Sequence, residues 1–312
     1  MLEKYAAIGA GIALIDHKEH CIKGQSNALD VGDYPGGITP NAISTLSKVS
    51  TSGKITLFAS VGDDKAGDFY RTNSRELDGL QVIKGRETGV SNSYFENGRV
   101  VRSNTAYNCA SDFVVREQSL PMDFTPIFIT DLFTLSLTRK EHDLRKIADF
   151  ISSKSGFTIL NLAGIKYCID DVQVMLKKLR ISPGLVFGNE KEHTILNGVY
   201  QETNIFPSLV LKIITMGSKG SRIVFGDSEI LVPVQEVRSE QIIDEYGAGD
   251  CYEGVFIASL LSVSINEWSP TYLYQAAKLA SEAASSVVKN KSSRLQTDYA
   301  KPLATQILQL EH

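Results

Sequence analysis

Asp244-Glu245-Tyr246-Gly247-Ala248-Gly249-Asp250 runs directly into residues 251–261, an apolar stretch compatible with a helix. The glycines allow the backbone to turn sharply and to approach a ligand closely. If a helix starts here, its free N–H groups and the positive end of its dipole form a site for an anion. A carboxylate beside phosphate makes sense if Asp250 is the base that deprotonates an attacking hydroxyl group. The simpler alternative is a glycine turn in which Asp250 caps the helix.

Outward from this stretch, short apolar runs alternate with segments of helical period. The runs are residues 5–10, 54–61, 126–130, 157–162, 185–187 and 209–215. Thr39 as N-cap and Pro40 as first helical residue predict a helix over residues 41–49. The alternation predicts an α/β fold with a mainly parallel central sheet flanked by helices, and ligands at the carboxyl ends of the strands.

Two segments depart from this alternation. Residues 12–34 and 88–112 are polar, alternating and dotted with aromatic side chains, as in strands of a separate small sheet. Both segments leave the α/β core and return to it. We therefore expect a single domain over residues 1–312, with a small β-sheet lid formed by about residues 12–35 and 86–110.

Composition and charge exclude several classes of function. The 312 residues carry a net charge of −4 and show no Lys/Arg stripe, which argues against a nucleic-acid partner. No apolar run approaches the roughly 18 residues of a membrane span. The four cysteines (Cys21, Cys109, Cys168 and Cys251) and the five histidines form no metal-ligand spacing. We expect reduced thiols, a cytoplasmic location and no membrane partner.

Two glycine-containing turns are candidates for ligand contact. Gly36 and Gly37 precede the helix at residues 41–49, so the backbone there can lie close to a small ligand, and Asn41 offers a donor and an acceptor to hydroxyl groups. Gly217 and Gly220 follow Thr215, the last residue of an apolar run, and suit a loop against a nucleotide phosphate. Each segment can also be read as an ordinary turn.

Asn189 and Glu192 follow the short apolar run at residues 185–187. Three positions apart at a helix start, their side chains can face the same way and hold magnesium through water. The same residue types also serve simply as helix caps.

Together, and in this order, these segments resemble the PfkB-type, ribokinase-like carbohydrate kinase family over nearly the whole chain. The resemblance rests on Gly-Gly-x-x-x-Asn at residues 36–41, Val61-Gly62-Asp63-Asp64-x-x-Gly67, and the heptapeptide ending in Asp250. It implies a ribokinase-like fold and an ATP-dependent phosphotransferase that uses Mg²⁺ and acts on a small molecule, as a monomer or homodimer.

The resemblance also implies a role for each matching residue. Asp250 matches the catalytic base, and the amides of Gly247, Ala248 and Gly249 match the hole for the charge of the transferred group. The acceptor side is implied for Asp16, Gly36, Gly37, Asn41 and Asn104, with Arg102 as a lid arginine near the reacting phosphate. The nucleotide side is implied for Asn189, Glu192, Thr215, Gly217 and Gly220, with Asn189 and Glu192 near magnesium.

Within the family, residues 9–16, 104–109 and 161–163 are similar to adenosine kinases. A nucleoside, adenosine first, is therefore the expected acceptor, and Tyr94, Phe95 and Tyr107 are candidates for stacking on a base. A sugar kinase of the ribokinase or fructokinase type and a catalytically inactive nucleoside-binding protein remain as alternatives. The chain departs from the family pattern at Glu245 and Tyr246, and Tyr246 could narrow the ATP side.

Overall fold

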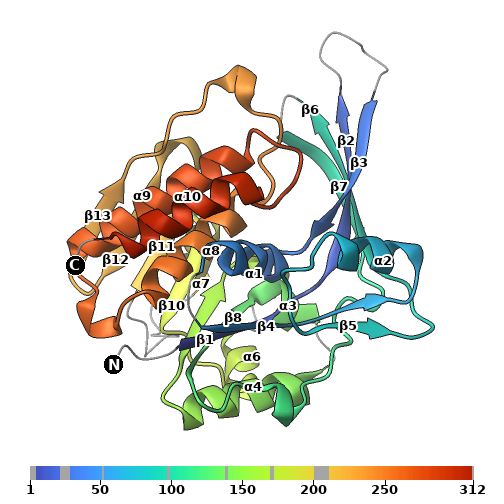
Figure 1. The fold of residues 1–312 in the computed structure, drawn as a ribbon, viewed down its shortest axis with the longest axis horizontal. Helices are drawn as coiled ribbons and strands as arrows, with labels where there is room; N and C mark the ends of the chain where they lie inside the picture. The colour runs from blue at the N-terminus through green and yellow to red at the C-terminus, as the bar shows by residue number, and fades with distance from the viewer. Residues whose placement is uncertain are drawn as a thin grey trace.

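The computed structural model describes residues 5–21, 29–50, 53–96, 99–137, 140–168, 172–199 and 211–310. A nine-stranded sheet in the order β13-β12-β11-β10-β9-β8-β1-β4-β5 forms the centre (Figure 1). All neighbours from β11 to β5 run parallel, and β12 and β13 are antiparallel to their neighbours. The strands are β1 (Tyr5–Ala10), β4 (Lys54–Gly62), β5 (Leu80–Ile83), β8 (Thr125–Asp131), β9 (Phe157–Asn161), β10 (Leu185–Asn189), β11 (Leu211–Thr215), β12 (Ser221–Phe225) and β13 (Ser228–Val232).

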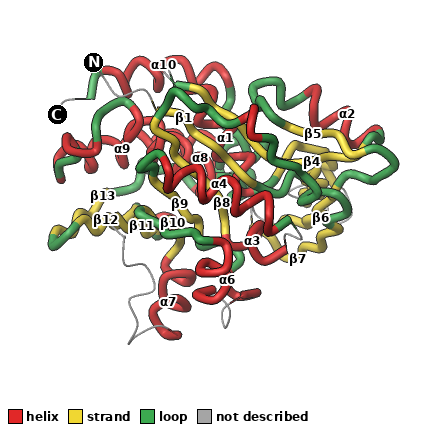
Figure 2. Tube along the Cα trace, turned by 90° about the horizontal axis from the view of Figure 1, so that it is seen from below, coloured by secondary structure: helices red, strands yellow, loops and turns green. Residues whose placement is uncertain are grey.

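Helices cover both faces of this sheet, as Figures 1 and 2 show from two directions. Alternate residues of β1 face opposite cores, since Ala7 belongs to one buried cluster and Ile8 to the other. One face carries α1 (Ile38–Val49), α8 (Ala248–Leu261), α9 (Pro270–Val287) and α10 (Thr297–Leu308), and the other carries α3 (Leu132–Leu137), α4 (Glu141–Ser153), α5 (Ile165–Cys168), α6 (Val172–Leu179) and α7 (Glu190–Val199). Among the described residues, no helix is both long and apolar enough to cross a membrane.

The two polar segments form one small four-stranded sheet, which stands beside the central sheet in Figure 1. Its order is β3-β2-β6-β7, with β2 (Leu14–Cys21), β3 (Leu29–Gly36), β6 (Gly89–Glu96) and β7 (Arg99–Ala106). Each segment folds into an antiparallel hairpin, and the hairpins meet through the parallel pair β2–β6. The remaining helix, α2 (Lys65–Thr72), follows β4. The predicted α/β architecture with a small second sheet is confirmed.

The predicted start of α1 is wrong. The helix begins at Ile38, its N-cap is Gly37, and no side chain caps it. Thr39 lies inside the first turn, where its hydroxyl group donates to Asp131 Oδ2 at 2.6 Å. The reason is tertiary: the buried carboxylate at the end of β8 needs donors, and Thr39 supplies one across 92 positions of sequence.

Candidate active site

The heptapeptide at residues 244–250 leads into the first turn of α8, which begins at Ala248. Gly247 is the N-cap residue with a φ of 79°, in the left-handed region, and a Cβ there would lie 2.0 Å from the carbonyl oxygen of Ser293. Glycine is therefore required by conformation and by close packing. Every residue from Cys251 to Leu261 is buried, so the free amides of the first turn sit at the end of a helix dipole enclosed by protein.

Asp250 lies in the first turn of α8, and its carboxyl group is held by a side chain from α1. Asn41 Nδ2 donates to Asp250 Oδ2 at 3.0 Å. Asp250 keeps some exposed surface, yet burial raises the pKa of its carboxyl group from 3.8 to about 7. The hydrogen bond from Asn41 opposes this rise, while the charges of Asp131, Asp16 and Glu192 add to it. A carboxyl group with a pKa near neutrality is suited to accept a proton from a hydroxyl group.

Asn41 is itself oriented by Arg294, a buried residue that precedes α10. Arg294 Nε donates to Asn41 Oδ1 at 2.9 Å, which leaves the Asn41 amide nitrogen to face Asp250. The guanidinium group also donates to Ser74 Oγ at 2.6 Å and to the Tyr70 hydroxyl group at 2.7 Å. Each polar atom of Asn41 thus has one protein partner, while the amide has a second N–H and a second lone pair, and the contact of Asn41 with ligand hydroxyl groups stays a prediction.

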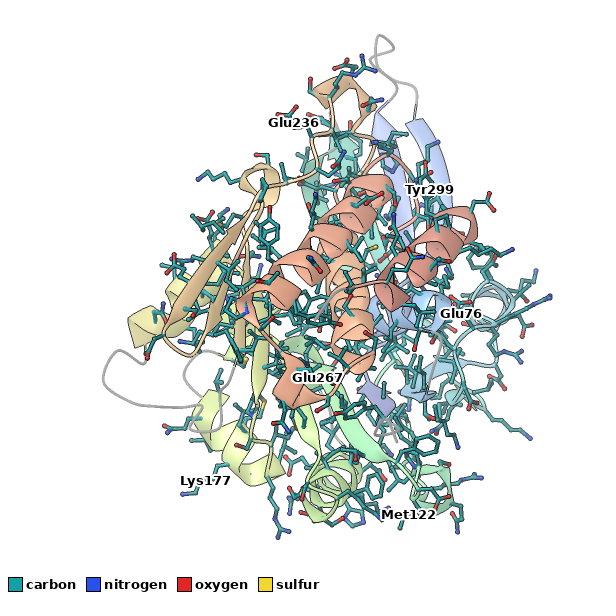
Figure 3. All side chains as sticks on the ribbon, turned by 60° about the vertical axis from the view of Figure 1, so that its left-hand side comes forward. Glu76, Met122, Lys177, Glu236, Glu267 and Tyr299 are labelled. Atoms are coloured by element: carbon teal, nitrogen blue, oxygen red, sulfur yellow. The ribbon has the colours of Figure 1, made fainter. Side chains whose placement is uncertain are left out.

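The surroundings of Arg294 extend to two further elements. The Tyr70 hydroxyl group in turn donates to the carbonyl oxygen of Gly36 at 3.1 Å. Glu76, labelled in Figure 3, lies 3.7 Å from Arg294 Nη1 and 3.5 Å from Lys48 Nζ. Sequence reasoning missed Arg294 because no motif surrounds it, and its partners come from distant parts of the chain.

Polar side chains stand at the carboxyl ends of neighbouring parallel strands, at the same edge as the start of α8. Asp131 ends β8, is buried, and accepts from the amide of Thr134 at 2.6 Å. Asn161 ends β9 and donates to Glu253 Oε2 at 2.5 Å. Burial raises the pKa of Glu253 to about 8. Glu253 lies one turn after Asp250, and Asp131 adds its charge to the rise in the pKa of Asp250. None of these three residues was among the predicted site residues.

Asn189 and Glu192 cap the start of α7 reciprocally. Asn189 Oδ1 accepts from the amide of Glu192 at 3.0 Å, and Glu192 Oε2 accepts from the amide of Asn189 at 2.8 Å. The interpretation of these two residues as helix caps is therefore confirmed. Burial raises the pKa of Glu192, and the negative charge of Glu192 contributes to the raised pKa of Asp250. The described residues contain no cluster of three or more acidic, His or Cys side chains able to hold a metal ion.

Thr215, Gly217 and Gly220 form a tight turn between β11 and β12. Gly217 and Gly220 have φ angles of 57° and 94°, and the amide of Met216 donates to the carbonyl oxygen of Gly220 at 2.8 Å. A Cβ on Gly220 would lie 2.1 Å from the carbonyl oxygen of Val232, whereas a Cβ on Gly217 would meet nothing within 4 Å. The backbone of Gly217 is thus open to approach at the end of the strand next to β10.

Asp16 lies on the face of β2 that packs toward the core. Burial raises the pKa of its carboxyl group to about 6, and the charges of Lys18 and Arg294 oppose this rise. A Cβ on Gly36 would lie 2.4 Å from Asp16 Cγ, so glycine there makes room for the carboxylate. Gly37 has a φ of 107°, and a Cβ would lie 2.0 Å from the carbonyl oxygen of Ile12. Both glycines are thus required by the protein's own packing, Gly36 against Asp16 and Gly37 against the backbone of Ile12.

An apolar and aromatic cluster adjoins Asp16 along β2. Leu14, on the same face of the strand, packs in a cluster with Tyr107 and Phe133. The ring centroids of Tyr107 and Phe133 are 5.3 Å apart, and those of Phe133 and Tyr167 are 5.7 Å apart. Tyr107 was among the predicted stacking residues, whereas Phe133 and Tyr167 were not. A buried carboxylate therefore stands on the same strand face as a residue that packs with aromatic rings, and these rings meet edge-on or tilted.

Arg102 and Asn104 lie on the outer strand of the small sheet, and both are exposed. The guanidinium carbon of Arg102 sits 5.4 Å from the ring centroid of Tyr94, on the neighbouring strand β6. Asn104 pairs with Asn92 in the β6–β7 ladder. In this arrangement neither residue contacts Asp250 or Asp16, so their predicted roles require movement of the sheet.

Tyr246 packs against the small sheet. Its ring centroid lies 5.2 Å from that of Phe95 in an edge-on arrangement and 5.4 Å from Lys18 Nζ. Phe95 in turn stacks on His20, with centroids 4.4 Å apart. The heptapeptide thus contributes amides to one side of the site and an aromatic side chain to the other.

Comparison with known proteins places this geometry in context. A model of the pfkB family of carbohydrate kinases matches residues 3–298. No curated protein matches the chain by sequence at a significant level. Among solved structures, the fold is similar to adenosine kinase from Sinorhizobium meliloti, with a TM-score of 0.77, 20% identity, and coverage of 97% of this chain and 99% of that one.

Two further structures share the fold. Ribokinase from Giardia lamblia has a TM-score of 0.73 and 20% identity, and the alignment covers 96% of this chain and 99% of that one. A sugar kinase from Pyrococcus horikoshii in complex with ATP has a TM-score of 0.72 and 19% identity, with 95% and 99% covered.

Proposed function

We propose that this chain, which belongs to the pfkB family of carbohydrate kinases, is an ATP-dependent kinase that phosphorylates a hydroxymethyl group of a nucleoside, adenosine first. The observation that carries the proposal is the position of Asp250. A carboxyl group with a pKa of about 7 lies in the first turn of a buried helix that begins Gly247-Ala248-Gly249.

The step follows from this arrangement. The acceptor hydroxyl oxygen attacks the γ-phosphorus of ATP, the bond from that phosphorus to the β–γ bridging oxygen breaks, and ADP leaves. Asp250 takes the hydroxyl proton as the new bond forms, while the amides at the start of α8 stabilise charge on the transferred group. Asn41 and Arg294 hold the carboxylate in place. A Cβ on Gly249 would meet nothing within 4 Å, which leaves space before these amides.

The apolar cluster beside Asp16 favours a nucleoside over a free sugar. Asp16 suits the hydroxyl groups of a ribose, which both acceptor classes share. The aromatic side chains of Tyr107 and Phe133, which pack in one cluster with Leu14, offer apolar ring surface that suits a purine ring. A free sugar would leave that surface without a partner. The sugar kinase therefore stays as the second candidate, supported by Asp16 and by the similarity to a ribokinase and to a sugar kinase.

The nucleotide side is proposed at the ends of β10 and β11. Gly217 gives open backbone there, and Asn189 and Glu192 lie at the neighbouring strand end. Mg²⁺ prefers oxygen ligands and keeps several waters, so ATP oxygens and water would provide most of its shell. Glu192 fits a role at that shell because only one of its carboxylate oxygens is used in capping α7. From the amino-acid composition, we propose that the enzyme is cytoplasmic.

The test is a panel of nucleosides and sugars, assayed for transfer from Mg-ATP. Adenosine is expected to give the highest kcat/KM, and Asp250→Asn is expected to lower kcat by about 10²- to 10⁴-fold with little effect on acceptor binding. Excess chelator should abolish transfer. A preference for ribose or fructose would select the sugar kinase, and transfer undiminished in Asp250→Asn would overturn the mechanism. Acceptor binding with no transfer would point to an inactive binding protein.

A further inference from the structure

Lys18 is a fully buried cation in strand β2, two residues beyond Asp16 on the same strand face. Its ammonium group donates to Asp244 Oδ2 at 2.5 Å, to the carbonyl oxygen of Lys291 at 2.9 Å and to Ser293 Oγ at 2.8 Å. An ammonium group has three N–H donors, so these contacts use all of them. Lys18 therefore joins the small sheet to two segments outside it, one at Asp244 and one at residues 291–293.

Both of those segments shape the start of α8. Asp244 opens the heptapeptide, and its second carboxylate oxygen accepts from the amide of Tyr246 at 2.8 Å, which fixes the turn leading to Gly247. Ser293 packs against Gly247 so closely that a Cβ there would lie 2.0 Å from the Ser293 carbonyl oxygen. A displacement of either segment would move the amides of residues 247–249.

The same ammonium group is linked to Asp16 through one hydroxyl group. Ser293 Oγ donates to Asp16 Oδ2 at 3.4 Å while it accepts from Lys18. The charge of Lys18 is also the largest influence holding down the pKa of Asp16 against burial, ahead of Arg294, whereas Asp244 raises it. Lys18 thus favours the ionised form of the carboxylate that would bind acceptor hydroxyl groups.

Aromatic rings enclose the ammonium group on its remaining sides. The centroids of Tyr34, Phe95 and Tyr246 lie 5.5, 5.7 and 5.4 Å from Lys18 Nζ. Ring faces at this distance attract a cation and keep water away from it. Tyr34 and Phe95 belong to the small sheet and Tyr246 to the heptapeptide, so the enclosure is itself shared between the two parts.

We propose that Lys18 is a positioning residue for the phosphoryl transfer, which fixes the amides at the start of α8 relative to the acceptor carboxylate Asp16. The inference rests on the proposed function. A buried ion pair alone is weak evidence for a role beyond folding. Lys18 differs because its three acceptors belong to the segments that adjoin the start of α8. Asp16, two positions away on the same strand face, belongs to the acceptor side of the same site.

The experiment replaces the buried pair by a neutral one, Lys18→Met with Asp244→Asn, so that no unpaired charge remains in the interior. The double variant is expected to keep a cooperative thermal transition, to lose about 10²-fold in kcat, and to show a raised acceptor KM with a nearly unchanged KM for ATP. A folded double variant with wild-type kcat and acceptor KM would overturn the proposal.

Two further variants complete the test. Ser293→Ala removes only the hydroxyl link and is expected to fold, to raise the acceptor KM several-fold and to lower kcat, while unchanged constants would contradict the inference. Lys146→Met is the matched control, because Lys146 also donates to a carboxylate and a carbonyl oxygen, those of Asp143 and Val115, away from the site. It should leave both constants unchanged. A wild-type protein that transfers phosphate to no acceptor would refute the proposed function itself. That result is distinct from variants with wild-type constants, which would refute only the role of Lys18.

Discussion

Asp250 is the residue that the sequence alone identified most directly, because two glycines and a following apolar stretch mark a helix start. Its immediate partners were not predicted in their observed roles. The predicted contact of Asn41 with ligand hydroxyl groups stays a prediction, whereas its position between Asp250 and Arg294 was not predicted. The raised pKa of Asp250 depends on burial by the folded chain, which no local motif encodes.

Asp250 should make folding stability depend on pH. The pKa of its carboxyl group is about 7 when folded and near the ordinary value of 3.8 when unfolded. The favourable contribution of the protonated form is complete below pH 3.8 and is lost as pH rises through about 7. Asp250→Asn cannot ionise, so its advantage over the wild type in free energy of unfolding should be larger at pH 8 than at pH 5, by on the order of 2 kcal/mol after allowance for partial exposure, and its melting temperature should follow.

Thermal melts of both proteins at the two pH values check this expectation. Asp227→Asn, at an exposed position in the turn between β12 and β13, is the control and should show the same difference at both values. An Asp250→Asn difference that does not change with pH would contradict the raised pKa.

The start of each helix at the strand ends shows how far local signals reach. Glycine and a carboxylate correctly located the beginning of α8, and Asn189 with Glu192 located that of α7. Thr39 misled the prediction for α1, since its hydroxyl group serves Asp131 instead of the helix backbone. Capping rules hold where a side chain has no stronger tertiary partner, and they fail beside a buried carboxylate.

Two glycines at the start of α8 have different roles, one in folding and one in the proposed function. Gly247→Ala should lower the melting temperature, because the position has a φ of 79° and no room for a Cβ. Gly249→Ala adds a methyl group in open space at a helical position and should stabilise the fold by roughly 0.5–1 kcal/mol. The same methyl group should hinder the approach of phosphate to the amides and lower kcat/KM by about 10-fold or more.

Gly198→Ala is the matched control, since Gly198 lies in α7 with nothing within 4 Å of an added Cβ. It should give the stabilisation of Gly249→Ala with unchanged kinetics. Circular dichroism melts and steady-state kinetics on the three variants distinguish these outcomes. Full activity in Gly249→Ala would argue against phosphate at the start of α8.

At the scale of the molecule, periodicity was sufficient for the architecture. Apolar runs predicted the parallel strands β1, β4, β8, β9, β10 and β11, with the last beginning at Leu211 and residues 209–210 outside the described part of the chain. The polar segments predicted the small sheet but not its parallel pair β2–β6. Strand pairing between segments 75 positions apart leaves no local signal in the sequence. The contacts of Lys18 and Arg294 leave none either, because each of these residues has partners near the opposite end of the sequence.

The small sheet is expected to close further over bound substrates, which would exclude water from the transfer. Arg102 is exposed here, stacked over Tyr94, and closure would bring its charge toward the reacting phosphate. Arg102→Ala should lower kcat more than it weakens ATP binding. Arg71→Ala, an exposed arginine paired with Asp68 on α2, serves as the control. Kinetics and calorimetry with ATP separate the two effects, and an unchanged kcat would remove Arg102 from the site.

The bond from Arg294 to Asn41 has a consequence for the order in which the chain acquires its structure. The two residues are 253 positions apart, and Lys18 and Asp244 are 226 apart. During synthesis the early strands emerge long before the residues that hold their polar side chains. Until residue 294 has left the ribosome, Asn41, Asp16 and Lys18 lack their partners, and loop closure over such distances is slow. Nascent chains are thus expected to need protection from aggregation late, at the step that also creates the catalytic centre.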